Sequence, residues 1–259
     1  MKRLPLWAWF WIILGSLYFL LPLYGTFEFS LRARRGVYSL DAYQNVLADP
    51  NFRDTFTYST MLALATILIS LLLIVPTAYW VHLRLPRLRP VIEFLTLLPF
   101  VVPPIVLVFG LIKLYSRPPL LLVVSPGLLV AGYVVLSFPY IYRAVDTGLR
   151  AMDVRSLTEA AQSLGAGWPT ILFRVIFPNL RVSLLSGAFL TFAIVIGEFT
   201  LATMLNWPAF GPYLALIGAN RAYEPAALAI MSFGLTWAAI GIIQLLGRGA
   251  PGAQLAGPR

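Results

Sequence analysis

The sequence predicts an all-α membrane protein with six transmembrane helices. Of its 259 residues, 59% are hydrophobic and only 11% are charged, whereas a soluble domain is roughly half apolar and about a quarter charged. Five long stretches contain no Asp, Glu, Lys or Arg, and a sixth contains a single acid. So few charges do not suit a surface in water, and we expect a chain that crosses the bilayer several times.

The expected helices follow these stretches, because a spanning helix needs about 20 mostly apolar residues. The first begins with Lys2 and Arg3, as a signal peptide does, but its apolar part is longer than the roughly 7–15 residues of such a peptide. We therefore expect it to be retained. The stretch with one acid runs from Val182 past Glu198 to about Leu205. The charge-free stretches are Leu4–Phe27, Thr55–Val81, Phe94–Ile112, Pro118–Tyr142 and Pro225–Gly247.

The distribution of Lys and Arg predicts the orientation in the membrane, since cytoplasmic loops carry an excess of both. With the N-terminus inside, the inner segments hold 12 of the 19 Lys and Arg residues and the outer segments hold 7. We therefore expect both termini in the cytoplasm. The net charge of +9 then belongs mainly to the inner face. There it suits anionic lipid headgroups, and it is poor support for a nucleic-acid partner.

Several kinds of site are excluded by composition. The chain has no Cys and one His, His82, which excludes disulfides, thiolate zinc sites and iron–sulfur clusters. We interpret His82, beside Arg84, as an interfacial residue and expect no metal and no cofactor. A P-loop requires a Lys after Gly, and neither Lys2 nor Lys113 follows one. The chain therefore has no predicted catalytic residues and does not hydrolyse ATP itself.

The loops divide into short turns and three longer segments. In the outer loop 28–54, Ser39 is expected to cap a short helix through Val46, with Pro50 just after its end. Tight turns are expected at 84–90 and 113–119, and the outer loop 206–224 can dip back into the membrane as a short helix. The Gly/Pro-rich tail, residues 249–259, is expected to be flexible.

The inner loop 146–181 contains the least lipid-like segment, residues 156–178. Ser156 and Glu159 have the spacing of a capping box, and the helix they start is expected to end at Gly165. Pro169 suits the first turn of a second helix, which is expected to end at Pro178. Two short helices with a bend between them would protrude at the cytoplasmic face. The fold of a membrane-spanning chain does not require such an element, which favours a docking role.

This segment resembles the signature loop of a known family. Glu159-Ala160-Ala161, then Gly165, then Pro178 reproduces the spacing E-A-A-x3-G-x9-I-x-L-P, with Val and Phe at the Ile and Leu positions. That loop is typical of permease subunits of binding-protein-dependent ABC importers. Three further stretches, "SLDAYQNVLADPNFRDTFTYSTMLALA", "LLPFVVPPIVLVFGL" and "GAFLTFAIVIGEFT", resemble the family in the same order. The resemblance covers roughly residues 38–248 and is nearest to spermidine/putrescine-type permeases.

The resemblance implies a type I ABC importer permease fold in the inner membrane of a bacterium or archaeon. Residues 1–37 would form the first helix and the start of the outer loop, 38–248 the transport domain with five helices, and 249–259 the tail. The implied partners are a separate ATPase dimer, a second permease, identical or homologous, and an extracytoplasmic solute-binding protein. The residues implied to couple the chain to the ATPase are Glu159, Ala160, Ala161, Ser163, Leu164, Gly165 and Pro178.

Prolines and one acid mark a candidate solute pathway. Pro99, Pro103 and Pro104 lie within one expected span, and each removes a backbone donor and frees a carbonyl that needs a partner in lipid. A helix kinked beside a cavity meets that need, and so does a kink that serves packing alone. Glu198 is costly within a span unless it faces protein or water. It can bind a cationic solute, line a gate with Thr200, or pair with Thr200 or Arg221; we favour a gate or structural role.

Two other classes of membrane protein are weighed against this interpretation. An intramembrane enzyme needs several catalytic groups near the midplane, and only Glu198 is ionisable there. An ion-coupled secondary transporter would typically show an inverted repeat and further intramembrane charges, and the loop 156–178 would have no explanation. An ABC permease for iron or an oxyanion remains an alternative to a polyamine-like solute, since a G-E-F-x-x-T stretch is similar in those permeases.

Overall fold

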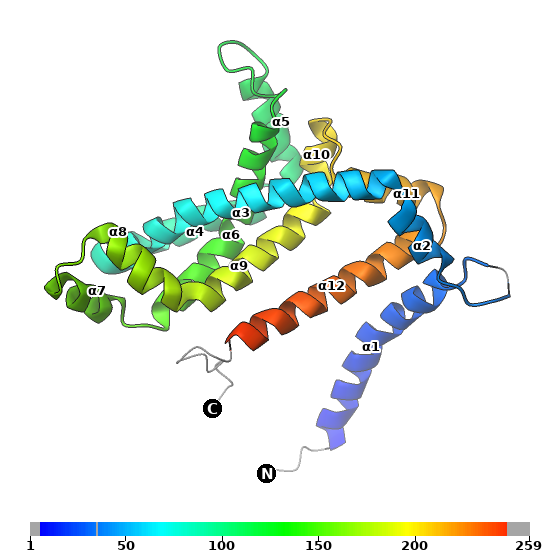
Figure 1. Ribbon diagram of the computed structural model, residues 1–259, viewed down its shortest axis with the longest axis horizontal. Helices are drawn as coiled ribbons and strands as arrows, with labels where there is room; N and C mark the ends of the chain where they lie inside the picture. Colours follow the sequence, from blue (N-terminus) through cyan, green and yellow to red (C-terminus); the bar gives the residue numbers. More distant parts are fainter. Residues whose placement is uncertain (1–5, 35, 248–259) are drawn as a thin grey trace. The chain divides into compact units, whose positions relative to one another are not determined.

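A computed structural model describes residues 6–34 and 36–247, and within them the regular structure is helical apart from one isolated bridge between Arg34 and Val37 (Figure 1). The tail predicted at 249–259 lies outside the described residues. The elements, in chain order, are α1 (Leu6–Ser30), α2 (Asp41–Ala48), α3 (Pro50–Arg84), η1 (Pro86–Leu88), α4 (Arg89–Val101), α5 (Pro104–Tyr115), α6 (Pro126–Arg150), α7 (Val154–Ser163), α8 (Trp168–Thr170), η2 (Ile171–Ile176), α9 (Phe177–Gly197), α10 (Thr200–Met204), α11 (Phe210–Asn220) and α12 (Glu224–Gly247).

Several of these helices are long and apolar enough to cross a bilayer. Among the described residues there are four, at Trp7–Ser30, Pro50–Arg84, Pro126–Arg150 and Trp168–Gly197, and a bent pair formed by η1–α4 and α5 adds a fifth. The sixth predicted span falls in α12, a helix of 24 residues, whose side chains beyond Ala238 are described only in part. The all-α membrane fold is confirmed, and the count of six spans stays a prediction.

The chain divides into two compact units, one of residues up to Asp54 with Tyr213–Ala238 and the other of Thr55–Pro212 with the residues from Ala239. The first unit holds the outer loop and α2. Leu40, without a side-chain hydrogen bond, precedes α2, so the prediction that Ser39 caps this helix is wrong. Packing explains the start of α2 instead, because Ala42 and Val46 on its inner face are fully buried.

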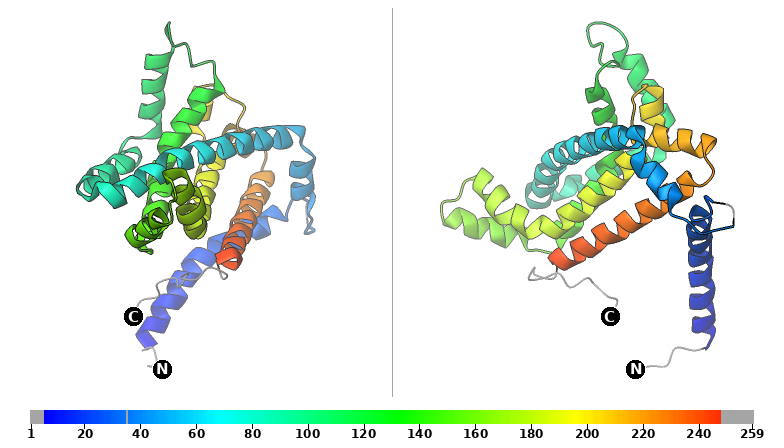
Figure 2. Two further views of the ribbon diagram at one scale, coloured as in Figure 1. Left: turned by 60° about the vertical axis from the view of Figure 1, so that its left-hand side comes forward. Right: turned by 45° about the vertical axis from the view of Figure 1, so that its right-hand side comes forward.

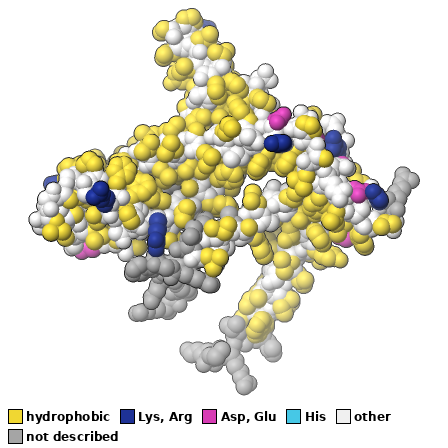
Figure 3. Space-filling view, viewed as in Figure 1, with side chains coloured by type: hydrophobic (Ala, Val, Ile, Leu, Met, Phe, Trp, Pro, Cys, Tyr) yellow, Lys and Arg dark blue, Asp and Glu magenta, His cyan; other side chains and the backbone are white. Residues whose placement is uncertain are grey.

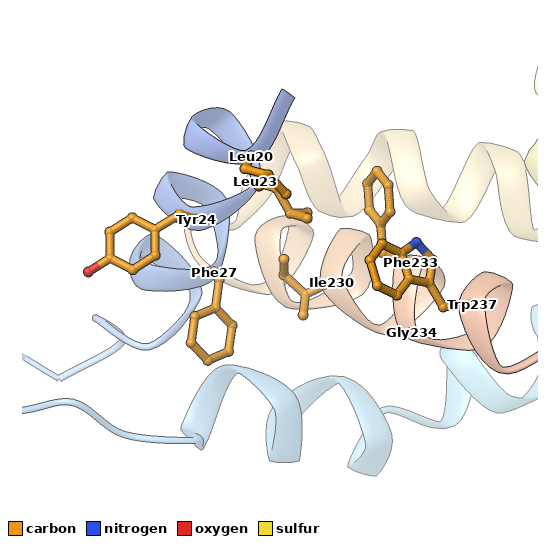
Figure 4. A pocket seen from close by; sticks show the side chains of 8 residues that line it. All are labelled: Leu20, Leu23, Tyr24, Phe27, Ile230, Phe233, Gly234 and Trp237. Atoms are coloured by element: carbon orange, nitrogen blue, oxygen red, sulfur yellow. The ribbon is translucent and has the colours of Figure 1, made fainter. Parts of the chain in front are cut away.

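An apolar groove lies between α1 and α12 in this first unit. It encloses about 450 Å³, and its lining is almost wholly nonpolar (Figure 4). Such a surface suits lipid acyl chains or another apolar helix and offers no partners to a polar solute. The residues lining it are Leu20, Leu23, Tyr24, Phe27, Ile230, Phe233, Gly234 and Trp237.

The second unit is organised around α6 and α9, which lie side by side, with α4 packed against α6 (Figure 2). Gly187 in α9 permits this close approach, because a Cβ there would lie 3.0 Å from Ala144 Cβ and 3.4 Å from Ile141 Cα. Small residues are the usual means by which membrane helices come close. Both buried clusters of this unit contain residues of α6 and of α9.

The outer surface is that of a protein solvated by lipid. Hydrophobic side chains cover most of the face shown in Figure 3, and charged ones form a few small groups. In α1, none of the apolar window that qualifies as a span is buried within the chain. Soluble monomers rarely expose large contiguous apolar areas, so the surface agrees with the membrane location that composition predicts.

Candidate functional site

The prolines at 103 and 104 interrupt the third apolar stretch more sharply than the sequence predicts. α4 ends at Val101 and α5 begins at Pro104, with the two helices bent by 97°. Val102 and Pro103 are extended, with ψ of 114° and 141°, because a residue that precedes Pro avoids the helical conformation. The expectation of a kink inside one helix is therefore wrong at this point: the stretch is a broken span or a re-entrant loop.

The three prolines take different places at this break. Pro99 lies within α4, Pro103 forms the linker, and Pro104 opens α5, where its missing N–H costs no hydrogen bond. Pro103 and Pro104 are exposed within the chain. Their environment is thus lipid, a solute path or another subunit.

Glu198 sits at a second break, between α9 and α10. Its side chain is buried, with the residue 9% exposed. The carboxylate accepts hydrogen bonds from Leu201 N at 2.9 and 3.0 Å and from Ala202 N at 3.2 Å. These amides are the unpaired donors at the start of α10, where a negative charge is also favoured by the helix dipole. The acid is therefore stabilised as a helix cap.

The partners that the sequence suggests for Glu198 are not the ones found. Thr200 is the first residue of α10, and backbone amides beyond it hold the carboxylate. Arg221 lies within 4 Å of Asp49 and Glu224 instead. The pairing alternative with Thr200 is therefore wrong, the one with Arg221 stays a prediction, and the structural role is supported by direct contacts.

The beginning of α11 closes over this break. A Cβ on Gly211 would lie 2.1 Å from the carbonyl oxygen of Glu198 and 3.1 Å from Phe199 Cα. Beside it, Phe210 N donates to Ser59 Oγ at 2.8 Å. Only a residue without a side chain allows this approach. The interruption at Glu198 is thus held by α11 and by a polar contact to α3.

The inner loop forms α7 as predicted but with a different cap. Asp153 accepts hydrogen bonds from Ser156 N at 3.0 Å and from Ser156 Oγ at 2.7 Å, and these bonds lower the pKa of the Asp153 carboxyl. Glu159 pairs instead with Arg155, at 2.8 Å. The predicted capping box of Ser156 and Glu159 is therefore wrong, because the acid three residues before Ser156 is better placed and the helix begins at Val154.

The turn after α7 is built as the sequence predicts. Gly165 has a φ of +79°, a left-handed conformation that glycine adopts without strain. Gly165 N donates to Gln162 O at 2.9 Å and Ala166 N to Ala161 O at 3.0 Å, which satisfies carbonyls at the helix end. Pro169 then lies in the first turn of α8, as predicted.

Pro178 does not end the second helix. The chain continues from Trp168 to Gly197 as one span, with a π-helical stretch over Ile171–Ile176 just before the proline. In it Phe177 N bonds Leu172 O, and the side chain of Asn179 donates to Val175 O at 2.7 Å. This shifted bonding accommodates a residue without an N–H, so helix termination at Pro178, expected from sequence, is wrong.

The residues predicted to couple the chain to the ATPase differ in their exposure to solvent. Leu164, at the tip of the turn, is 89% exposed, whereas Ala161 is 9% exposed and belongs to the core of its own unit. A small side chain at Ala161 therefore serves α7 packing first. In Figure 1, α7 and α8 lie together beyond the start of α9. The remaining members, all exposed, are Glu159, Ala160, Ser163, Gly165 and Pro178.

A charged cluster near the C-terminal end of α6 contains His82, which the sequence analysis discussed, and several charged residues that it did not. Asp146, buried, accepts from His82 Nε2 at 2.7 Å and from Arg89 at 2.9 Å, and it pairs with Arg150 Nε at 2.7 Å. Arg150 also reaches Glu93, at 2.8 Å. The spacing of Asp146 and Arg150, four apart on one helix, is the local pattern that indicates part of it.

His82 thus belongs to this charged cluster, and its interpretation as an interfacial residue stays a prediction. The cluster is a set of ion pairs and hydrogen bonds rather than a cation site. Within residues 6–34 and 36–247, no group of three or more His, Cys, Asp or Glu side chains is placed to hold a metal ion.

Apolar helices long enough to span a membrane, one broken span, a break after α9 at Glu198 and an exposed helix–turn–helix together suit the membrane component of a transport system. The family model for the binding-protein-dependent transport system inner membrane component matches residues 74–249. The chain belongs to this family.

Curated relatives carry different substrate names. The spermidine/putrescine transport system permease protein PotB of Escherichia coli is 25% identical over 186 residues, which is 66% of each chain. A probable molybdenum ABC transporter permease protein of Haloferax volcanii is 32% identical over 58% of each chain. The molybdenum permease ModB of Azotobacter vinelandii is 33% identical over 56% of this chain and 70% of its own length. The chain thus spans only part of the first two relatives.

Solved structures show the same fold. A chain of a bacterial ABC transporter involved in alginate import has a TM-score of 0.63, with 20% identity, over 90% of this chain and 93% of its own. A chain of an amino acid ABC transporter gives a TM-score of 0.55, with 19% identity, over 80% and 97%. The predicted type I permease fold is confirmed, as are the resemblance to ABC importer permeases and the prediction of a non-catalytic, multi-pass membrane subunit.

Proposed function

We propose that this permease forms half of a solute pathway and couples to a separate ATPase dimer through the segment 154–170. A second permease, identical or homologous, supplies the other half, and an extracytoplasmic solute-binding protein delivers the solute. Both termini and the segment 154–170 lie in the cytoplasm. Family membership and the protruding α7–turn–α8 element support this assignment.

One observation carries the coupling role. Leu164 is 89% exposed at the tip of a turn in which the amides of Leu164, Gly165 and Ala166 are hydrogen-bonded, while Ala161 and Thr158 of the same helix are buried. A rigid, anchored turn that presents a leucine outward suits a pocket on a partner protein, since buried apolar anchors dominate binding energies. Ala160, exposed and small, allows close approach of that partner.

Retention of the ATPase during purification tests this role. Leu164→Asp and Ala160→Trp should each remove the ATPase from the purified permease without lowering permease yield, because neither side chain packs in the fold. Leu47→Asp is the matched control, since Leu47 is 63% exposed in α2, on the predicted outer face. Full ATPase retention in both test variants would place the docking surface elsewhere.

Two other changes in the segment act through the fold. Gly165→Pro is incompatible with a φ of +79°, because proline requires about −65°. Ala161→Trp overpacks the core of the second unit, which typically costs about 1–3 kcal/mol. Both should uncouple transport from ATP hydrolysis, but loss of coupling in Ala161→Trp alone does not identify the docking surface.

The solute is proposed to be polyamine-like, with an oxyanion of the molybdate type as the second candidate. The likeness to PotB supports the first, and the higher identities to molybdenum permeases, 32% and 33%, favour the second. Because the Glu198 carboxylate accepts hydrogen bonds from backbone amides, we do not assign it as a cation ligand. Uptake of labelled putrescine against molybdate, with the neighbouring genes co-expressed, separates the two.

For the pathway, we propose that Pro99, Pro103, Pro104, Glu198 and Thr200 border the gate. The two chain breaks at Pro103 and Glu198 support this assignment, since irregular backbone at membrane depth is tolerated where it is buried or lines a cavity. Cysteines introduced beside each break should gain access to a water-soluble reagent during turnover. Constant inaccessibility would refute the assignment.

A further inference from the structure

A buried hydrogen bond joins the C-terminal part of α3 to the segment 154–170, here called the coupling segment. Tyr79 in α3 and Thr158 in α7 are each 2% exposed, and their hydroxyl oxygens are 2.9 Å apart. The residues are 79 positions apart in sequence. α7 otherwise connects to the membrane helices through apolar packing, so this bond is the specific polar contact between them among the residues described.

The direction of this bond follows from proton counting. Thr158 Oγ1 donates its single hydrogen to Val154 O, at 2.7 Å, so it can only accept from Tyr79. The Tyr79 hydroxyl therefore depends on Thr158 as its acceptor. Removing the Thr158 hydroxyl leaves a buried donor unpaired, whereas removing the Tyr79 hydroxyl leaves Thr158 still bonded to Val154.

The same turn of α3 contacts α8 and α6. Trp168 packs against Tyr79 and Trp80, with ring centroids 6.3 and 4.8 Å away. Three residues after Tyr79, His82 bonds Asp146 of α6 at 2.7 Å, and Asp146 in turn holds Arg89 at the start of α4. One turn of α3 thus lies between the coupling segment and the charged cluster of α4 and α6.

We propose that Tyr79 is a positioning residue that transmits movement of the coupling segment to the membrane helices, with Thr158 as its acceptor and the His82–Asp146 contact as the next connection. This inference rests on the proposed coupling function. When the ATPases pull α7, the bond to Tyr79 moves the end of α3, and the cluster carries α4 and α6 with it. Because α4 leads directly into the Pro103 break, the movement reaches the proposed gate.

The first test needs only the full-length permease in nanodiscs, with hydrogen exchange of the α7 amides as the readout. Thr158→Val should raise the equilibrium constant for local opening of α7 about tenfold, because the buried Tyr79 hydroxyl loses its acceptor. Tyr79→Phe should raise this constant less, because it leaves no unpaired donor. Thr158→Ser keeps the acceptor and should exchange at the wild-type rate. In the double variant, Tyr79→Phe should relieve much of the Thr158→Val effect. Wild-type exchange in Thr158→Val would overturn the proposal.

The second test uses the complex with its ATPase, into which Val102→Cys is introduced beside the α4–α5 break of this cysteine-free chain. Labelling of that cysteine by an impermeant maleimide should change on adding ATP and vanadate. Thr158→Val should abolish the change while the ATPase stays bound, and Thr158→Ser should keep it. A full change in Thr158→Val would overturn transmission through Tyr79. Loss of the ATPase from every variant, wild type included, would instead refute the proposed docking, and the exchange measurement would still decide the role of the bond.

Discussion

Replacing Gly211 with alanine is expected to disrupt the break between α9 and α10. The added Cβ would lie 2.1 Å from the carbonyl oxygen and 2.7 Å from the carbonyl carbon of Glu198. Both are backbone atoms, so no side-chain rotation relieves the overlap. Either α11 moves away, or the residues that position the Glu198 carboxylate shift and its bonds to Leu201 and Ala202 lengthen.

The magnitude follows from the geometry. Overpacking a well-packed site costs roughly 1–3 kcal/mol, and contact with fixed backbone places this change near the upper end, about 3 kcal/mol. In a chain of this size about 1 kcal/mol shifts the unfolding temperature by roughly 2–4 °C. Gly211→Ala should therefore lower that temperature by about 6–12 °C.

The assay is thermal unfolding of the purified permease in nanodiscs. Gly218→Ala, in the same helix, is the control, because a Cβ there meets no atom within 4 Å. Alanine is favoured over glycine within a helix by about 0.5–1 kcal/mol, so this variant should unfold at or slightly above the wild-type temperature. If Gly211→Ala behaves like Gly218→Ala, α11 does not approach Glu198 and the account of this break is wrong.

Four further predictions address topology, the pathway, the charged cluster and the α7 cap. A cysteine at Ser163 should resist an impermeant reagent applied to intact cells; rapid labelling from outside would reverse the orientation. Glu198→Gln should reduce transport while assembly is kept, and wild-type transport by Glu198→Leu would exclude a functional cavity there. Asp146→Ala should destabilise the fold by about 1–3 kcal/mol, because Arg89 and Arg150 lose a buried acceptor while remaining partly exposed to solvent, measurable as a fall in unfolding temperature. Because hydrogen bonds from Ser156 lower the pKa of Asp153, its stabilisation of α7 is present above the usual value near 4 and is lost as pH falls through the folded pKa. Protection of the Ser156 amide, taken as its exchange rate relative to the intrinsic rate at each pH, should fall only there, and constant protection across this range would contradict the cap.

Local patterns account for what could be predicted near the coupling segment. Gly165 was identifiable because a helix that ends at a turn needs a residue in the left-handed region, and Pro169 because a first helical turn has no use for its N–H. The cap was misassigned because two acids, Asp153 and Glu159, each have plausible spacing to Ser156. Which acid forms the hydrogen bonds depends on where the preceding helix, α6, ends.

The sequence by itself determined the apolar helices, the turn between α7 and α8 and the family, because transfer of apolar residues into the bilayer and turn chemistry depend on neighbours along the chain. Only the tertiary structure decided that Ala161 faces inward while Leu164 faces outward, that the α10 amides hold Glu198, and that Tyr79 and His82 meet Thr158 and Asp146. The Tyr79–Thr158 and His82–Asp146 contacts join residues on different helices, 79 and 64 positions apart in sequence. Their partners are set by helix packing, for which a single sequence contains no periodic pattern to read.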